Sequence, residues 1–238
     1  MPPGFSGFPE EMVKFLRALK RNNRREWFQP RKHLFDQHVK APMLELISAI
    51  NIEMAKFAPE HVTEPKNAIF RIYRDTRFSA DKTPYKTHAA ASFSRRGNGR
   101  LGAGGFYFSV SPETIEIAAG IYHPERDVTL LLRNHIADTH GELTRILADK
   151  KARKLTGNLQ GDALTRAPKG FDPEHPAAGF IKMKDWILDV TLDPSLATSP
   201  KLLSEIVTRF RAMAPLLHYL NRPLIGRKPA RDLLEDRW

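Results

Sequence analysis

One segment of this sequence concentrates side chains that can bind an anion. Residues 71–88 read RIYRDTRFSADKTPYKTH and contain three arginines, two lysines, two aspartates and several hydroxyl side chains. Arginine suits such a site because its planar guanidinium group binds a carboxylate or a phosphate through two parallel hydrogen bonds. The segment therefore predicts a basic pocket or groove that binds a phosphorylated ligand or nucleic acid.

The side chains expected to bind this ligand are cations, hydroxyls and one aromatic ring. Pro84 stiffens the loop, and the ring of Tyr85 can either stack on a base or seal the core. Lys169, in the loop PKGFDPEHP, can approach from the second half of the chain and complete the positive lining. The expected ligand-binding residues are Arg74, Arg77, Ser79, Lys82, Thr83, Tyr85, Lys86 and Lys169.

Two aspartates in the same segment support two alternative interpretations. Arg71 is expected to brace the fold by pairing with Asp75 or Asp81, and if the other charges are also solvated or paired internally, the whole segment is purely structural. If the two carboxylates bind a divalent ion, the pocket would act as a metal-assisted phosphoester hydrolase. Five neighbouring cations oppose metal binding, and the sequence has no HExxH motif and no nucleophile elbow. We therefore predict no metal and no cofactor, and the sequence leaves open whether the protein is an enzyme.

The distribution of charge supports an anionic partner. The chain has 238 residues and a formal net charge of +11. Residues 66–105 contain nine lysines and arginines against two acidic residues, and residues 1–40 contain nine against four. If these two segments fold onto one face, that face attracts phosphates, nucleic acid or acidic partners.

Composition excludes several other classes of protein. The chain has no cysteine, which excludes disulfides, thiolate catalysis and cysteine-ligated metal sites. No window approaches 18 uncharged apolar residues, and the N-terminal region has the spacing of an amphipathic helix rather than a signal peptide. We therefore expect a cytoplasmic protein without a membrane segment, whose oligomeric state the sequence does not indicate.

Helices precede the basic segment and strands follow it. Apolar residues recur at helical spacing over residues 8–20, 22–40 and 43–56, and Pro30 is expected to kink or divide the second of these helices. From Ala68 the apolar period changes to two, which is typical of strands. The expected antiparallel strands are AIFRIYR, HAAASFS, GFYFSVS and TIEIAAGIY.

The second half of the chain is predicted to be mostly helical. Residues 126–154 should form two helices broken near Gly141, and residues 199–220 form a long helix that faces the core. Between them, WILDVTL at 186–192 reads as one further strand. The prediction is an α+β fold in which an antiparallel sheet of four or more strands, centred on 68–122 and extended by 186–192, is packed by N- and C-terminal helices. A single domain is expected over residues 1–224, followed by a charged tail over 225–238.

With these elements placed, the sequence resembles a known family. FLRALKRNNRREWF, FRIYRDTRFSADKTPYKTHAAASF, GFYFSVSP with GIYHPE, and PKGFDPEHP with IKMKDW occur in the order found in the uncharacterised family called domain of unknown function 2461. The likeness runs from about Phe5 to Leu224. It implies an intracellular single-domain α+β protein whose biochemical role is not established. Members typically read PKGYD where this chain has PKGFD, so Phe171 lacks the hydroxyl that tyrosine chemistry would need.

Overall fold

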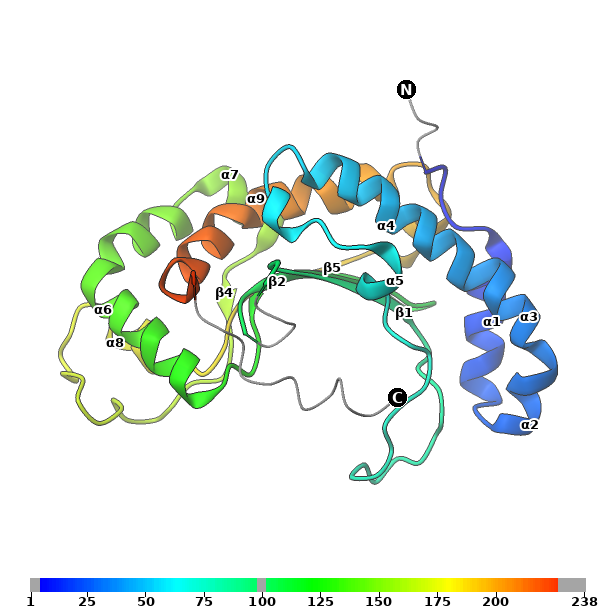
Figure 1. The fold of residues 1–238 in the computed structure, drawn as a ribbon, viewed down its shortest axis with the longest axis horizontal. Helices are drawn as coiled ribbons and strands as arrows, with labels where there is room; N and C mark the ends of the chain where they lie inside the picture. The colour runs from blue at the N-terminus through cyan, green and yellow to red at the C-terminus, as the bar shows by residue number, and fades with distance from the viewer. Residues whose placement is uncertain (1–4, 98–101, 227–238) are drawn as a thin grey trace.

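The fold is α+β, as the sequence predicts. A computed structural model describes residues 5–97 and 102–226. A single five-stranded antiparallel sheet curves beneath a layer of helices that come from both ends of the chain (Figure 1). All of the predicted tail from residue 227 onward lies outside the described residues.

The N-terminal third is a series of helical segments that Pro30 interrupts, as expected. Pro30 has no N–H to donate, and it lies in a three-residue 3-10 turn between two short helices. The segments are α1 (Glu10–Arg21), α2 (Arg25–Phe28), η1 (Gln29–Arg31), α3 (Lys32–Phe35), the π-helical η2 (Asp36–Lys40) and α4 (Ala41–Met54). Two further single turns, η3 (Pro59–His61) and α5 (Pro65–Ala68), connect α4 to the basic segment.

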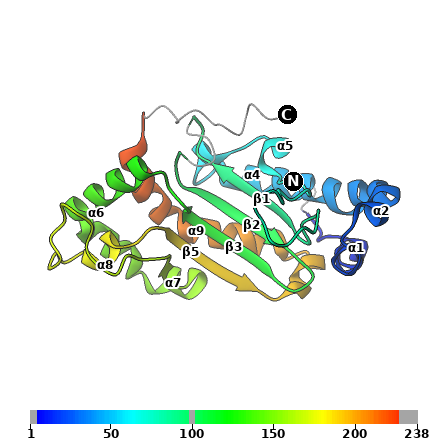
Figure 2. The same ribbon diagram turned by 90° about the horizontal axis from the view of Figure 1, so that it is seen from below.

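The sheet contains three of the predicted strands and confirms the additional strand at 186–192. Its strands are β1 (Ala89–Ser94), β2 (Gly105–Val110), β3 (Ile115–Ile121), β4 (Leu159–Gln160) and β5 (Trp186–Leu192). Their order across the sheet is β1-β2-β3-β5-β4, and every neighbouring pair is antiparallel. Figure 2 looks onto the face of the sheet that lies away from α4 and α9.

The strand predicted at 68–74 does not form as a regular strand. Ile69 and Tyr73 make only isolated bridges, to Ala91 and to Tyr85. After Ile69 the chain therefore leaves the edge of β1, and Tyr73 pairs with Tyr85 further along the same segment. Pro84 explains part of this, because proline cannot supply the N–H that a continuing ladder would need.

The core lies between the sheet and the layer of helices. It includes buried residues of α1 and α4 together with those of the helices of the C-terminal half. These helices are α6 (Arg126–Leu147), α7 (Lys150–Thr156), α8 (Ala178–Ile181) and α9 (Leu202–Asn221), with the short turns η4 (Pro194–Thr198) and η5 (Arg222–Leu224) at either end of α9. The inward face of the sheet packs on α9, where the rings of Phe106 and Phe210 lie 4.8 Å apart. Both rings are at most 1% exposed, and such burial of aromatic area is the main source of folding free energy.

The break predicted near Gly141 is present as a kink at Thr139, two residues earlier. Thr139 has non-helical backbone angles inside α6, whereas Gly141 is helical. The Thr139 hydroxyl donates to the carbonyl of His135 at 2.6 Å and lies 2.9 Å from the hydroxyl of Tyr219. A threonine whose hydroxyl donates to the carbonyl four residues earlier commonly bends a helix, and this contact accounts for the kink.

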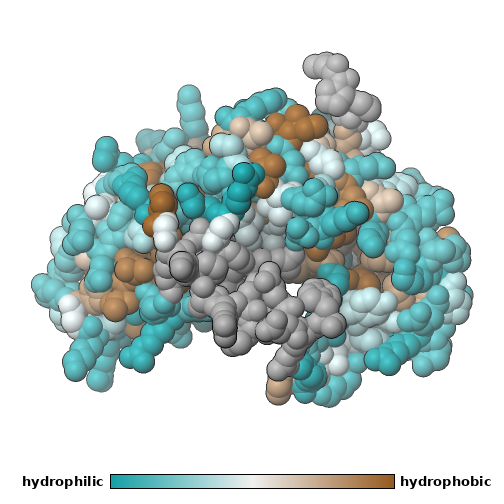
Figure 3. All heavy atoms as spheres, viewed as in Figure 1, coloured by the Kyte–Doolittle hydropathy of each residue, from teal (hydrophilic) through white to brown (hydrophobic). Residues whose placement is uncertain are grey.

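The surface in the view of Figure 3 is mostly hydrophilic over the helices at both ends of the molecule. Within the described residues, no helix is long and apolar enough to cross a membrane. Among the large hydrophobic side chains that the structure describes, Phe78 is the most exposed, at 95%.

Candidate functional site

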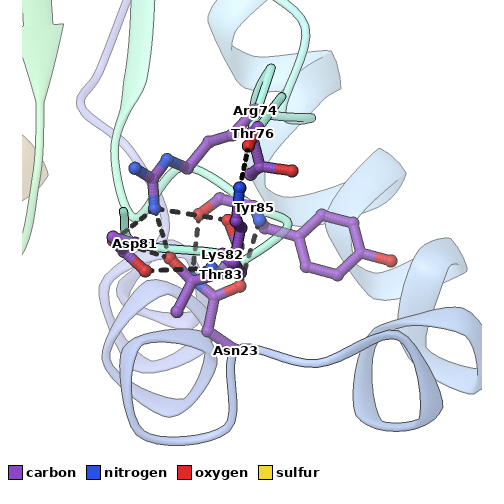
Figure 4. Close-up of polar contacts among 7 residues, drawn as sticks. All are labelled: Asn23, Arg74, Thr76, Asp81, Lys82, Thr83 and Tyr85. Atoms are coloured by element: carbon purple, nitrogen blue, oxygen red, sulfur yellow. Dashed lines mark hydrogen bonds and ion pairs between the residues drawn. The ribbon is translucent and has the colours of Figure 1, made fainter. Parts of the chain in front are cut away.

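Residues 71–88, which we call the basic loop, fold back on themselves and are clamped by Asn23. The N–H of Arg74 donates to the carbonyl of Pro84 at 2.9 Å, and the N–H of Lys86 donates to the carbonyl of Ile72 at 2.8 Å. Asn23 then exchanges two hydrogen bonds with the backbone of Tyr85, at 2.8 Å and 3.0 Å. Figure 4 shows this clamp beneath the loop.

The ring of Tyr85 seals the core. It is 1% exposed and stacks on Phe28, with ring centroids 4.2 Å apart. Of the two roles expected for this ring, packing in the core is the one its position matches, because a buried ring is not available to a base. The stacking anchors the basic loop to α2.

Arg74 connects the first part of the basic loop to Asp81 and Thr83 in its second part. Its Nη1 donates to Asp81 Oδ2 at 2.5 Å, to the Thr83 carbonyl at 3.2 Å and to the Thr83 hydroxyl (Figure 4). The N–H of Thr83 also donates to Asp81, at 2.9 Å. This backbone N–H, followed by the Arg74 guanidinium, lowers the pKa of Asp81 from 3.8 to about 2.

The second aspartate forms an exposed pair with Arg77. Nε and Nη2 of Arg77 donate to the two oxygens of Asp75 at 3.0 Å and 2.6 Å, and these hydrogen bonds hold the pKa of Asp75 well below its usual range. Arg71, the arginine expected to brace the loop, forms no ion pair with either aspartate among the described residues. Arg74 and Arg77 take that role.

A pocket of about 400 Å³ opens between the basic loop, the end of α1 and the start of β1. It brings together Arg74, Thr83, Tyr85 and Lys86 from the predicted set. Arg77, Ser79 and Lys82 do not line it, and Nζ of Lys82 instead donates to the carbonyl of Thr76 at 2.9 Å. Among the described residues, the pocket is lined by Lys20, Asn23, Arg74, Asp81, Thr83, Tyr85, Lys86, Thr87 and His88.

Lys169 does not line this pocket. The loop that carries it precedes α8, and both views place α8 at the opposite end of the sheet from β1 (Figures 1 and 2). The strand order gives the physical reason, because β1 and β4 are the two edges of the sheet. Lys169 therefore does not complete the positive lining of this pocket, in contrast to what the sequence suggests.

Four lining residues were absent from the predicted set: Lys20, Asn23, Thr87 and His88. Lys20 and Asn23 lie at the end of α1 and just after it, and only contact between α1 and the basic loop makes them part of a site. Nζ of Lys20 donates to Glu113 at 2.9 Å. Burial, followed by the charge of Lys86, lowers the pKa of His88 and favours its neutral form.

Within the part of the chain that the structure describes, no group of three or more histidines, aspartates and glutamates is arranged to hold a metal ion. Asp75 and Asp81, the carboxylates considered as metal ligands, each bind an arginine instead. Both are exposed, so their ion pairs contribute little to folding stability. Their negative charge nevertheless offsets part of the positive charge of the loop.

Comparison with known proteins identifies the family. A family model described as conserved hypothetical protein (DUF2461) matches residues 11–219, which is most of the chain. The chain belongs to this family. The resemblance noted in the sequence is thereby confirmed, and the DUF2461 match extends from α1 through the sheet into α9. No match was found among curated proteins or among solved structures.

Proposed function

We propose that this DUF2461 protein binds a small phosphorylated ligand in the pocket beside the basic loop. The proposal is supported by three cations, Lys20, Arg74 and Lys86, which line one concavity together with the hydroxyls of Thr83 and Thr87. Asp81 is the one carboxylate among the residues that line it. A volume of about 400 Å³ is in the range of small-molecule sites.

The observation that carries this proposal is the way Arg74 distributes its hydrogen bonds. Within residues 5–97 and 102–226, all the hydrogen bonds that its guanidinium donates leave from Nη1. Nε and Nη2 therefore keep donors for an incoming oxyanion, while Asp81 and Thr83 fix the position of the group. A pre-positioned arginine loses less side-chain entropy when it binds a phosphate.

Nucleic acid is the second candidate ligand, and the exposed ring of Phe78 favours it. Phe78 lies beside Arg77, whose guanidinium carbon is 5.7 Å from the centre of the ring. An exposed ring among cations is the arrangement on which single-stranded bases stack. The hydrolase alternative has less support, because Asp75 and Asp81 bind arginines. If neither ligand class binds, the purely structural interpretation of the loop remains.

Calorimetric titration with glucose 6-phosphate, glucose, AMP and adenosine tests the proposal. We expect the phosphorylated member of at least one pair to bind and its unphosphorylated partner to bind at least tenfold more weakly. Lys86→Ala should weaken phosphate binding roughly fivefold to tenfold, because it removes one charge from the lining. Arg77→Ala is the matched control, since Arg77 lies outside the pocket, and it should leave the affinity unchanged.

A labelled oligonucleotide distinguishes the two ligand classes. Binding to a groove should fall with salt, with a slope of about −0.7 to −0.9 per phosphate contact, and Lys82→Ala combined with Lys86→Ala should reduce both affinity and slope. If the oligonucleotide binds with a steep salt dependence while the protein does not distinguish the phosphorylated small molecules from their unphosphorylated partners, the site is a nucleic-acid groove and not a small-ligand pocket. If no compound binds, the basic loop is a structural brace and the proposal is wrong.

A further inference from the structure

A second site lies at the far end of β3, where the backbone of His123 is unusual. Among the described residues, His123 is the only non-glycine residue with a positive φ, at 46°. Such a conformation is uncommon for a residue with a side chain, and it persists only where the surroundings impose it. His123 belongs to the segment GIYHPE, which the basic loop and its pocket do not explain.

Asp185 is the residue that holds His123 in this conformation. Its side chain is 4% exposed, and its Oδ1 accepts the backbone N–H of His123 at 2.6 Å. The same oxygen lies 3.2 Å from Nδ1 of the His123 ring. Both residues are in place because Ile121 pairs with Trp186 at the last position of the β3–β5 ladder.

The segment that carries Asp185 is itself anchored. Arg133 in α6 donates to the carbonyl of Ile181 at 2.8 Å and to the carbonyl of Met183 at 3.1 Å. On the other side, Gly120 brings β3 so close to β5 that a Cβ atom there would lie 2.0 Å from the carbonyl oxygen of Trp186. The carboxylate is therefore fixed by packed structure, although the ring that it orients is exposed.

This geometry gives the two nitrogens of the His123 ring different roles. Nδ1 lies 3.2 Å from an oxygen of a buried carboxylate, and the nearby negative charge favours the tautomer with the proton on Nδ1. Nε2 then carries a lone pair on a ring whose side chain is 65% exposed. The ring of Tyr122 lies against it, with centroids 3.9 Å apart. A histidine oriented by a carboxylate in this way can accept a proton, and the carboxylate stabilises the imidazolium that forms.

The charge around the dyad indicates the class of substrate. Within residues 5–97 and 102–226, no lysine or arginine forms an ion pair with Asp185. A dianionic phosphate would approach a carboxylate that no lysine or arginine in this range neutralises, which is unfavourable, whereas an uncharged ester would meet no such repulsion. The pocket beside the basic loop adjoins Ala89, whose partner Val110 pairs with Ile115 at the start of β3. The two sites thus lie at opposite ends of β3, about 20 Å apart.

We propose that His123 and Asp185 form an acid–base dyad that hydrolyses uncharged acyl esters. Nε2 of His123 takes a proton from water as the water oxygen bonds to the ester carbonyl carbon. The ester C–O bond then breaks, and the leaving alkoxide receives the proton from Nε2, so that one ester and one water give an acid and an alcohol. His123 is the catalytic residue, and Asp185 is a positioning residue that acts through it.

Hydrolysis of p-nitrophenyl acetate by the full chain tests the catalytic role. The best variant is His123→Asn, because asparagine tolerates positive φ and its amide N–H can still donate to Asp185, while Nε2 is lost. We expect the rate to fall at least about tenfold, the lower range for loss of a general base. His33→Asn, which changes an exposed histidine in α3, should leave the rate unchanged. Equal rates in all three proteins would overturn the proposal.

The choice of substrate is tested with p-nitrophenyl phosphate, which has the same leaving group and a dianionic ester. We expect the acetate to be hydrolysed and the phosphate not. If p-nitrophenyl phosphate is hydrolysed faster than the acetate, and His123→Asn abolishes that hydrolysis, the assignment to uncharged esters is wrong.

Nitrogen NMR of the histidine side chains tests the positioning role independently of turnover. Wild-type His123 should carry its proton on Nδ1. In Asp185→Asn the amide oxygen can still accept the backbone N–H, but the negative charge is gone, so the tautomer should shift toward Nε2–H and hydrolysis should fall about tenfold or more. If His123→Asn fails to fold, the wild-type spectrum decides, because a ring protonated on Nε2 contradicts the dyad.

Discussion

The basic loop and the His123–Asp185 dyad place charge in opposite ways. In the loop, two aspartates and two arginines form exposed pairs, and the strongest contacts are between residues close in sequence. In the dyad, a carboxylate that is 4% exposed meets a histidine 62 residues away. Exposed pairs contribute little to stability because water screens them, whereas a buried carboxylate depends on its partners.

The difference shows that a segment with many charged residues close together in the sequence is not necessarily the site whose side chains are held most firmly by the fold. The loop attracts attention because its charges are adjacent in the sequence, yet Asp75 and Asp81 neutralise part of that charge locally. The dyad has two ordinary residues in separate motifs and is assembled by sheet pairing. If this comparison is correct, substitutions at the dyad end should affect folding strongly, and substitutions in the loop should affect mainly ligand binding.

The largest effect is expected from Gly120→Ala. Gly120 has a φ of +149°, and an added Cβ would meet the Trp186 carbonyl oxygen at 2.0 Å, so β3 and β5 must separate. We expect a loss of about 3 kcal/mol or more in the free energy of unfolding, measured by urea denaturation. Gly179→Ala is the control, since a Cβ there meets nothing within 4 Å. Equal stability of the two variants would show that the β3–β5 contact is looser than described.

A smaller loss is expected from Asp185→Ala. This change leaves the backbone N–H of His123, which is partly buried, without its acceptor, and such a loss costs about 1–3 kcal/mol. Asp75→Ala in the basic loop should produce a much smaller change in the same denaturation experiment, because its ion pair with Arg77 is exposed. If the two variants lose equal stability, the contrast between the regions fails.

Asp81→Asn should change ligand affinity more than it changes stability. Asp81 is the carboxylate that lines the pocket, so removing its charge should tighten binding of a phosphorylated ligand roughly threefold to tenfold. Calorimetric titration against wild type measures this. Weaker binding would instead mean that Asp81 acts mainly by positioning Arg74, as its 2.5 Å hydrogen bond also allows.

The smallest effect is a loss of stability in acid that originates in the basic loop. The pKa of Asp81 is lowered on folding from 3.8 to about 2, so its contribution is fully present above pH 3.8 and is lost as the pH falls through about 2. Asp81→Asn should therefore differ from wild type at pH 5, and this difference should shrink toward pH 2. Denaturation at both values measures it, and a constant difference would exclude the ion pair as its source.

Sequence reasoning was most successful where local pattern decides structure. The strand at Trp186–Leu192 and the interruption at Pro30 follow from periodicity and from the missing proline N–H, and both are confirmed. The family resemblance is likewise confirmed. Residues 68–74 also alternate, but only two isolated bridges form there, to Ala91 and to Tyr85, and Pro84 cannot supply the N–H that a longer ladder would need.

The sites were harder to predict because they depend on strand order. The sequence identified Arg74, Thr83 and Lys86 as part of a pocket, but it could not show that α1 contributes Lys20. Lys169 was misplaced because nothing local indicates that β1 and β4 are opposite edges. The contact between His123 and Asp185 has no sequence signal of its own, since it exists only after β3 and β5 pair.

The pairing of β3 with β5 also determines the order in which the strands of this protein can fold. The hairpins that join β1, β2 and β3 are local, whereas Ile117 pairs with Val190, more than 70 residues later in the chain. Closing such a long connection is slow, and during synthesis the first three strands leave the ribosome well before β5. The edge of β3 is then open to pairing with other nascent chains, so aggregation of truncated or slowly translated protein should begin at that edge.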